Sequence, residues 1–429
     1  MTPYISFKDF YPIQNLCKPK FQYSDEPFIH IYHSNVSNYP HISVTGKSFH
    51  SETEAATKAC FEAFERYSYS DFLPEDFLED SFEQVKNDSL NIFSLAGFSN
   101  EQKDKNKILQ FNKYTRFRFF KGECLTDKSF QFIPLQLLSP RYFLSMMNFR
   151  KEKKQDSEFY EPILRSPITT GTAAGLSKED VIYGGILEVI ERDAFMVTYL
   201  NQMSRSLIDL GKTDITVNGR HIADYFKDYN LEIYAVRLLS DMPIHTIATC
   251  IVDRMGKGPA LSIGASAGHN LKEVVLKATG EALTSRLYNR ANNLFNSDTG
   301  VPLEKFKQRE RKIFWSKFEN LSKIQFLIDS PKETNAPKFD VENLSLAERI
   351  ELLLSVFKKK EYAVYYADIA PQFLKKLGIE IGKIIIPEMQ PMHLNEMLPF
   401  FGGKRIRNVP ISMGYKPAIE INILPHPFH

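Results

Sequence analysis

One spacing rule recurs three times along this chain, and it constrains the fold more than any other feature. A residue that can cap a helix is followed by an acid three positions later and by a glutamate eight positions beyond the acid. The three sets are Ser51, Glu54 and Glu62; Ser177, Asp180 and Glu188; and Asn270, Glu273 and Glu281. A lead rich in small residues precedes each set, at 45–48, 171–175 and 264–268. The shared spacing indicates an internal triplication.

Each copy predicts the start of a helix. A Ser or Asn side chain at the cap accepts from free backbone N–H groups, and an acid at the third helical position can bond back to the cap. We expect helices over about 51–69 and 177–203, and a third that begins near Asn270. Because 3.6 residues make a turn, Glu62, Glu188 and Glu281 should lie about three turns into their helices at similar angles. Equivalent helices would then present equivalent carboxylates.

The first two copies continue into a Glu-x-x-Glu-Arg motif. Its members are Glu62, Glu65 and Arg66 in the first copy and Glu188, Glu191 and Arg192 in the second. Residues three and four apart share a helix face, so two such helices could gather four carboxylates and two guanidiniums. Divalent cations and a polyphosphate would satisfy both signs. The alternative is a pair of solvated helix faces, but apolar neighbours such as Phe64 and Ile190 favour burial.

Composition excludes several functional classes. The 429 residues carry a net charge of only +2, so no strong field favours nucleic acid or an anionic membrane. The four cysteines are scattered and lack the paired spacing of a zinc or redox motif. No signal sequence opens the chain and no apolar run is long enough to cross a bilayer. We therefore expect a cytoplasmic protein with reduced cysteines.

Outside the triplicated segments, short apolar runs predict strands. We expect strands over 114–120, 232–237, 246–253, 362–366 and 383–387, and a helix over 371–377 that Gly378 ends. Residues 1–43 are interpreted as an N-terminal extension of strands and turns, and residues 44–429 as the main domain. The domain ends in a proline-containing tail, which is held extended because proline fixes its own backbone angle.

Together these motifs resemble the YcaO family, in particular its SagD-like, azoline-forming cyclodehydratases (D proteins). The resemblance covers the chain from about Val44 onward. It rests on the two Glu-x-x-Glu-Arg helices, Asp193 after the second of them, Glu281, the segments 386–393 and 401–405, and the ending at 425–428. It implies an α+β fold of YcaO type, with mixed or antiparallel sheets and helices built from internal repeats.

The resemblance also implies an ATP site with Mg2+. Five glutamates are then the expected metal ligands: Glu62, Glu65, Glu188, Glu191 and Glu281. The same five residues, together with Lys47, Arg66, Asp180 and Arg192, are expected to bind the nucleotide. The family's C-terminal tail borders its active site, which implies a catalytic role in substrate positioning or proton transfer for Pro425, His426, Pro427 and His429.

The reaction implied by the resemblance closes a ring in a ribosomally synthesised precursor peptide. A Cys, Ser or Thr side chain attacks the preceding carbonyl, ATP phosphorylates the resulting oxygen, and phosphate leaves to give a thiazoline or oxazoline. The implied partners are the precursor peptide, a separate E1-like leader-binding protein and, as a further candidate, a flavin-dependent dehydrogenase. A homodimer or hetero-oligomer is the expected assembly.

The sequence departs from the family pattern at several positions, which keeps two alternatives open. Ala59 stands where a Ser is usual, Leu176 where an Asn is common, and Thr284 and Ser285 where a Gln is expected. Further prolines are also expected near the chain end. One alternative is a non-catalytic scaffold that binds peptide or partner subunits. The other is an enzyme that uses external sulfide and forms a thioamide.

Overall fold

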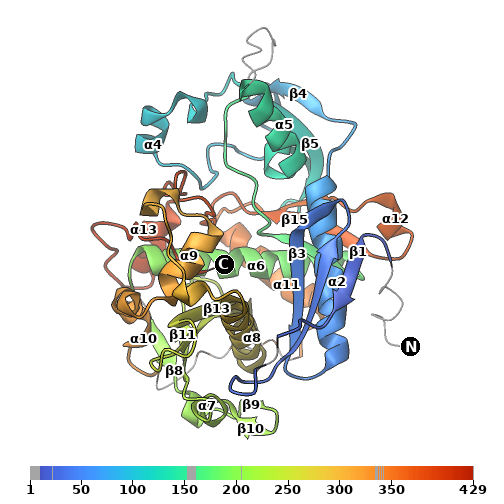
Figure 1. Ribbon diagram of the computed structural model, residues 1–429. Coiled ribbons are helices and arrows are strands. Elements are labelled where there is room, and N and C mark those ends of the chain that lie inside the picture. The colour runs from blue at the N-terminus through green and yellow to red at the C-terminus, as the bar shows by residue number, and fades with distance from the viewer. Residues whose placement is uncertain are drawn as a thin grey trace.

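Three strand–helix units surround the middle of the molecule (Figure 1). The computed structural model describes residues 10–428 apart from positions 22, 152–160, 204, 334–336, 338, 340 and 342. The units are β3 (Tyr39–Ser48) with α2 (Glu52–Asp71), β7 (Thr172–Gly175) with α6 (Lys178–Leu200), and β13 (Leu261–Gly268) with α8 (Leu271–Ala291). Each unit contains one copy of the triplicated motif, so the expected helices are present.

The strand of each unit belongs to a different antiparallel sheet. A three-stranded sheet has the order β1-β2-β3, a four-stranded sheet β13-β12-β11-β8, and a six-stranded sheet β4-β5-β14-β15-β7 with β6 paired to β5. The remaining strands are β1 (Ile13–Cys17), β2 (His30–Val36), β4 (Leu78–Ser81), β5 (Arg116–Cys124), β6 (Ser129–Pro134), β8 (Ser206–Ile208), β9 (Thr216–Val217), β10 (Arg220–His221), β11 (Glu232–Arg237), β12 (His245–Val252), β14 (Tyr365–Asp368) and β15 (Glu380–Ile385). The expected α+β class is confirmed.

The other helices lie around the sheets (Figure 1). They are α3 (Phe82–Val85), α4 (Asn100–Lys105), α5 (Pro140–Lys151), α7 (Ile222–Lys227), α9 (Gln308–Ser316), α10 (Gln325–Ile328), α11 (Leu346–Lys359), α12 (Gln372–Lys375) and α13 (Arg405–Ser412). None of the described helices is long and apolar enough to cross a membrane.

The helix caps are nearly identical in the three copies. The backbone N–H of the acid donates to the cap side chain at 3.1 Å in each, from Glu54 to Ser51, from Asp180 to Ser177 and from Glu273 to Asn270. We also expected the carboxylate of each acid to accept a hydrogen bond from the backbone N–H of its cap residue. For these described helix starts that expectation was wrong. The Glu54 carboxylate accepts from the Ser48 hydroxyl instead, and that of Asp180 from the Ser177 hydroxyl.

Each motif helix packs closely on its own strand. A Cβ at Gly46 would lie 1.9 Å from the carbonyl oxygen of Ala55 on α2, and one at Gly264 would lie 2.4 Å from that of Ala278 on α8. Any larger residue would push helix and strand apart. Helix α6 contacts β7 and β15 of the six-stranded sheet and also β12 and β13 of the four-stranded sheet. The second copy therefore joins the two larger sheets.

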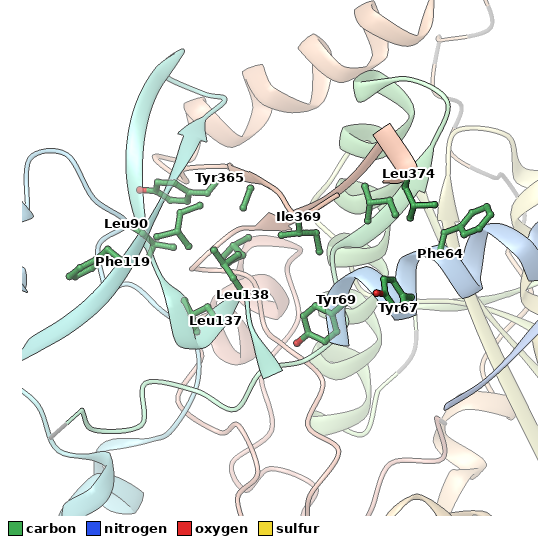
Figure 2. Packing of buried hydrophobic residues seen from close by; sticks show 14 of the residues in the cluster. Phe64, Tyr67, Tyr69, Leu90, Phe119, Leu137, Leu138, Tyr365, Ile369 and Leu374 are labelled. Atoms are coloured by element: carbon green, nitrogen blue, oxygen red, sulfur yellow. The ribbon is translucent and has the colours of Figure 1, made fainter. Parts of the chain in front are cut away.

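The side of α2 away from its glutamates is buried in a large apolar cluster (Figure 2). Phe64 and Tyr67 of α2 belong to the same cluster as Phe119 of β5, Leu138 and Leu374 of α12. Phe64 and Phe119 have no exposed surface. This side of α2 is therefore part of the core, as the apolar neighbours of the motif predicted.

Several boundaries differ from the expectation. Helix α6 ends at Leu200 rather than Met203, where the Asn201 side chain donates to carbonyls of both α6 and α13. Strand β14 starts at residue 365 instead of 362, because 360–362 form the turn that ends α11, with a positive φ at Glu361. Gly378 follows α12 with φ of +71°, as expected of a helix stop. The proposed 43/44 domain boundary falls inside β3, which pairs with β2 on both sides of it.

Candidate functional site

A cavity of about 360 Å³ lies where the three motif helices meet. Its described lining consists of Lys47, Lys58, Phe61, Glu62, Glu65, Arg66, Ala174, Glu188, Glu191, Arg192 and Glu281. Eight of these residues are the candidates that the sequence supplied. The eight side chains retain between 12% and 32% of their surface exposed, which fits groups that face a cavity rather than bulk water.

Each copy fixes its first glutamate in the same way. A backbone N–H of the copy's own lead donates to the Oε2 atom of the glutamate: Thr45 to Glu62 at 3.3 Å, Gly171 to Glu188 at 2.9 Å, and Ala265 to Glu281 at 3.4 Å. In each case the second carboxylate oxygen remains available to the cavity or to a neighbouring cation. The lead thus orients the glutamate that follows it about sixteen residues later.

The arginines of copies one and two repeat one geometry. Arg66 lies 3.6 Å from Glu62 and 3.3 Å from Glu65. Arg192 lies 3.6 Å from Glu188 and 3.0 Å from Glu191. Each guanidinium therefore bridges the two glutamates of its own motif. The i,i+4 spacing on a helix accounts for the contact with the first glutamate, while the second glutamate directly precedes the arginine in the chain.

Copy three obtains its cation from copy one. No arginine follows Glu281 at the corresponding position, and Lys47 of β3 lies 3.1 Å from Glu281 instead. Thr284 is directed elsewhere, because its hydroxyl donates to the Gly280 carbonyl of the same helix. The Ser285 hydroxyl is buried and has no described hydrogen-bond partner. The third copy therefore differs from the first two in the residue that neutralises its glutamate.

Burial changes the protonation of the cavity. It raises the pKa of Glu65 and of Glu191 to about 8, against the opposing effect of Arg66 and Arg192. Burial also opposes ionisation of Glu281, but Lys47 and Arg192 hold its pKa below the usual value. The protons held on Glu65 and Glu191 below pH 8 reduce the negative charge that faces the four cations of the lining, Lys47, Lys58, Arg66 and Arg192. The cavity is then suited to a polyanion.

The residues present fit both Mg2+ and phosphate. Carboxylate oxygens are the ligands that Mg2+ takes from proteins, usually alongside substrate phosphates. One guanidinium nitrogen of Arg66 and one of Arg192 are buried without a hydrogen bond of good geometry. The Oε1 atom of Glu191 is in the same situation. These nitrogens form the ion pairs of each arginine with the second glutamate of its motif, at 3.3 and 3.0 Å, and a ligand oxygen could accept the hydrogen bonds that they lack. In the described residues no three acidic, His or Cys side chains are already arranged around one metal position.

A second cavity of about 640 Å³ adjoins the first. The two share Lys47, Lys58, Glu191 and Glu281 as lining residues. The second cavity is less polar, and its apolar side chains include Ile29, Phe49 and Leu276. A ligand with a charged and an apolar end could therefore occupy both.

The structure does not bring Asp180 into the cavity. It lies in the first turn of α6 and is used in the cap with Ser177, where its carboxylate accepts the Ser177 hydroxyl at 2.7 Å. Glu188 follows eight residues later, which is about 12 Å along the helix axis. At this separation Asp180 and Glu188 cannot both bind the same small ligand group.

The C-terminal tail docks beside the cavity rather than lining it. The carbonyl oxygen of Pro425 accepts from Tyr199 at 3.0 Å and from Trp315 at 2.8 Å. His426 is fully buried, and its Nε2 atom lies 2.6 Å from the His393 carbonyl oxygen. Pro427 is also buried, whereas His429 lies outside the described residues. The catalytic role of these four residues stays a prediction.

Two residues at the site were missed by the sequence analysis. Lys58 lines both cavities, and its position one turn before Glu62 was the signal that could have identified it. The ring of Phe428 lies 4.1 Å from the guanidinium carbon of Arg192. No local pattern predicts that second contact, because 236 positions separate the two residues in the chain.

Comparison with known proteins agrees with this geometry. The family model described as YcaO cyclodehydratase, ATP- and Mg2+-binding, matches residues 45–390. An uncharacterized protein of Methanothermobacter thermautotrophicus is 24% identical over 244 residues, which is 56% of this chain and 59% of that protein.

Solved structures share the fold. A heterocyclase in complex with substrate and cofactor has a TM-score of 0.77 at 18% identity, covering all of this chain and 57% of its own. YcaO from Methanopyrus kandleri, bound with AMPPCP and Mg2+, has a TM-score of 0.61 at 13% identity, covering 93% of this chain and 92% of its own. A chain of the E. coli microcin synthetase McbBCD complex has a TM-score of 0.61 at 15% identity. The match covers 96% of this chain and 96% of that chain.

The chain thus spans somewhat more than half of the first curated relative and of the first heterocyclase that it matches. The family model covers most of the sequence, including all three glutamates that the leads hold in place. It also describes the ligands, ATP and Mg2+, that the charges of the cavity fit. This protein belongs to the YcaO family.

Proposed function

We propose that this chain is the ATP- and Mg2+-dependent subunit of an azoline-forming peptide cyclodehydratase. One observation carries the proposal. Two Glu-x-x-Glu-Arg helices, α2 and α6, line one cavity, and Lys47 and Glu281 complete it. None of the positions that depart from the family pattern removes a charged group from this cavity. The scaffold alternative therefore has less support than the enzyme.

The proposed roles follow from the charge of each side chain and from the hydrogen bonds that orient it. Glu62, Glu188 and Glu281, each held by a backbone N–H, would hold Mg2+. Arg66 and Arg192 would bind phosphate oxygens, as would Lys47 and Lys58. ATP with Mg2+, when bound, supplies the phosphoryl group that activates an amide oxygen. The less polar adjoining cavity would take the nucleoside.

The ring closure balances as the loss of one water per ring. A thiol or hydroxyl of the peptide adds to the preceding carbonyl carbon, and its proton goes to solvent. The former carbonyl oxygen takes the phosphoryl group and leaves as phosphate, while the amide nitrogen loses its proton and forms the C=N bond. Positioning and charge stabilisation are what the protein contributes to such a transfer.

Partners are part of the proposal. A solved McbBCD complex contains bound pro-MccB17, and its matched chain shares this fold. We propose an equivalent arrangement here, in which a separate E1-like protein binds the leader of the precursor peptide. A flavin-dependent dehydrogenase would act on the azoline after ring closure. The assembly would be a homodimer or hetero-oligomer.

The test is a mass measurement on the precursor peptide after incubation with ATP, Mg2+, the leader-binding partner and this chain. We expect the loss of one water mass per ring. Glu188→Gln should weaken ATP binding in the presence of Mg2+ by about 10- to 100-fold, the scale of a charged interaction. Glu351→Gln, in an exposed pair with Lys128, is the control and should behave as the wild type.

Other outcomes would point elsewhere. A folded protein that binds no nucleotide in calorimetry would support the scaffold alternative. A sulfide-dependent exchange of oxygen for sulfur in the peptide would indicate thioamide formation. Either result contradicts the proposed cyclodehydratase.

A further inference from the structure

Lys383 is a fully buried lysine behind the glutamate cavity. It lies on β15 and has 1% of its surface exposed. Its ammonium group donates to the carbonyl oxygen of Ile168 at 2.6 Å, to that of Thr170 at 3.1 Å and to the hydroxyl of Thr172 at 3.2 Å. All three ammonium protons therefore have acceptors, and all three acceptors belong to one short segment, 168–172.

This segment is the part of the chain that holds Glu188. The Gly171 N–H donates to the Glu188 carboxylate at 2.9 Å. The carbonyl oxygen of Gly171 accepts from the Ile384 N–H at 2.7 Å. Strand β15 thus holds the segment twice, through the Lys383 side chain and through the backbone of Ile384. Gly171 has φ of +84°, a backbone conformation that glycine adopts readily and other residues rarely adopt.

Lys383 also contacts the first copy of the motif. Its ammonium nitrogen lies 4.6 Å from the ring centre of Tyr69 on α2. That helix carries Glu62 and Glu65. One buried lysine is therefore in contact with the helix that carries Glu62 and Glu65 and with the lead that holds Glu188.

Burial lowers the pKa of Lys383 to about 7, while the carboxylates of Glu188 and Glu65 act against this shift. In the described residues no ion pair within 4.0 Å joins its ammonium nitrogen to a carboxylate. Burying an ammonium group among neutral acceptors costs more free energy than burying an apolar side chain of similar size. An ammonium group, unlike an apolar side chain, can donate directional hydrogen bonds to three oxygens of the lead.

We propose that Lys383 is a positioning residue of the YcaO site, which holds the 168–172 lead so that the Gly171 N–H orients Glu188 toward bound Mg2+. The inference rests on the proposed nucleotide site and concerns a residue that does not line it. Groups that orient metal ligands from behind typically change metal affinity by about 10- to 100-fold when removed.

The experiment compares three variants of the full chain. Lys383→Met removes the three donors and keeps an unbranched chain. Thr172→Val removes one acceptor and keeps the side-chain shape. Lys178→Met is the matched control, because Lys178 also lies over a tyrosine ring, that of Tyr366 at 4.8 Å, but pairs with Glu123 away from the cavity.

Two readouts are taken. In nucleotide-free protein, hydrogen exchange of the 168–175 backbone should become faster in Lys383→Met, while exchange of α8 stays unchanged. In calorimetry, the Mg2+ concentration needed for tight ATP binding should rise about 10- to 100-fold in Lys383→Met. Thr172→Val should shift both readouts in the same direction by a smaller factor, and Lys178→Met should shift neither.

Unchanged exchange at 168–175 together with an unchanged Mg2+ requirement in Lys383→Met would overturn the inference. If Lys383→Met fails to fold, Thr172→Val decides, since an unaltered Mg2+ requirement in that variant contradicts the proposal. Failure of the wild-type chain to bind ATP would instead overturn the proposed function, while the exchange measurement would still test the hold of Lys383 on the lead.

Discussion

Single residues in the cavity owe their properties to their position. Glu65 and Glu191 are the second glutamates of their motifs, and burial raises the pKa of each to about 8. Glu62 and Glu188, one turn earlier, accept a backbone N–H from their leads. Of the two glutamates in each motif, one is thus oriented by a backbone N–H, and the other holds a proton up to a pH of about 8. Binding of Mg2+ would displace that proton.

This division predicts a pH dependence of stability. Between the usual glutamate pKa of 4.5 and about 8, the folded protein retains protons at Glu65 and Glu191 that the unfolded chain has released. The free energy of unfolding should therefore fall as pH rises through this window. Glu65→Gln and Glu191→Gln, singly and together, should flatten the slope in denaturant titrations from pH 5 to 8. An unchanged slope in the double variant would contradict the raised pKa values.

At the level of elements, close packing between helix and strand aligns the copies. Gly184 and Gly185 are neighbours in α6 with opposite surroundings. A Cβ at Gly185 would lie 2.6 Å from the Ile384 side chain and 2.8 Å from the Gly171 carbonyl oxygen, whereas one at Gly184 would meet only the Ala173 Cβ at 3.6 Å. A Cβ at Gly185 would fit only if neighbouring atoms moved, whereas a Cβ at Gly184 would make an ordinary van der Waals contact.

The two alanine substitutions should therefore have different effects on the free energy of unfolding. Gly185→Ala should lower the free energy of unfolding by about 1–3 kcal/mol, because it separates α6 from β15 and from the lead that holds Glu188. Gly184→Ala should be neutral or stabilise by up to about 1 kcal/mol through helix propensity. Chemical denaturation measures both, and calorimetry should show weaker ATP binding only in Gly185→Ala. Equal effects of the two substitutions would contradict this packing argument.

Across the whole molecule, the C-terminal tail connects the chain end to the cavity. Phe428 has 3% of its surface exposed and packs in the cluster with Trp315 and Ile406, while its ring lies against Arg192. Figure 1 places the C-terminus in the middle of the molecule, beside α6. The tail is therefore part of the core around the site.

Two substitutions of Phe428 can distinguish its packing in the core from its contact with Arg192. Phe428→Leu should keep most of the packing but weaken ATP binding by about 2- to 5-fold, since a cation–π contact is worth about 0.5–1 kcal/mol. Phe428→Ala should in addition lower the free energy of unfolding by up to about 3 kcal/mol. Ile423→Ala, at a position that is 75% exposed, is the control. Wild-type affinity in Phe428→Leu would show that the ring does not orient Arg192.

The local features were predictable because they arise within one helix. The cap residues follow from the unpaired N–H groups of a helix start. The similar placement of Glu62, Glu188 and Glu281 and the pairing of each arginine with the first glutamate of its motif follow from the period of 3.6 residues. Strand positions such as 232–237 followed from apolar runs, whereas the start of β14 did not, because the turn that ends α11 extends into the apolar run. Asp180 fitted the repeat but serves the cap, which spacing alone could not distinguish from a ligand.

The sequence by itself determined that three copies exist, which glutamates they present, and that the third copy lacks an arginine. Only the tertiary structure decided that Lys47 supplies the cation for Glu281, that Phe428 lies on Arg192, and that Lys383 holds the lead of Glu188. The physical reason is the range of the interactions. A helix places neighbours on one face whatever surrounds it, whereas these three contacts join residues more than two hundred positions apart and exist only once the sheets have assembled around α6.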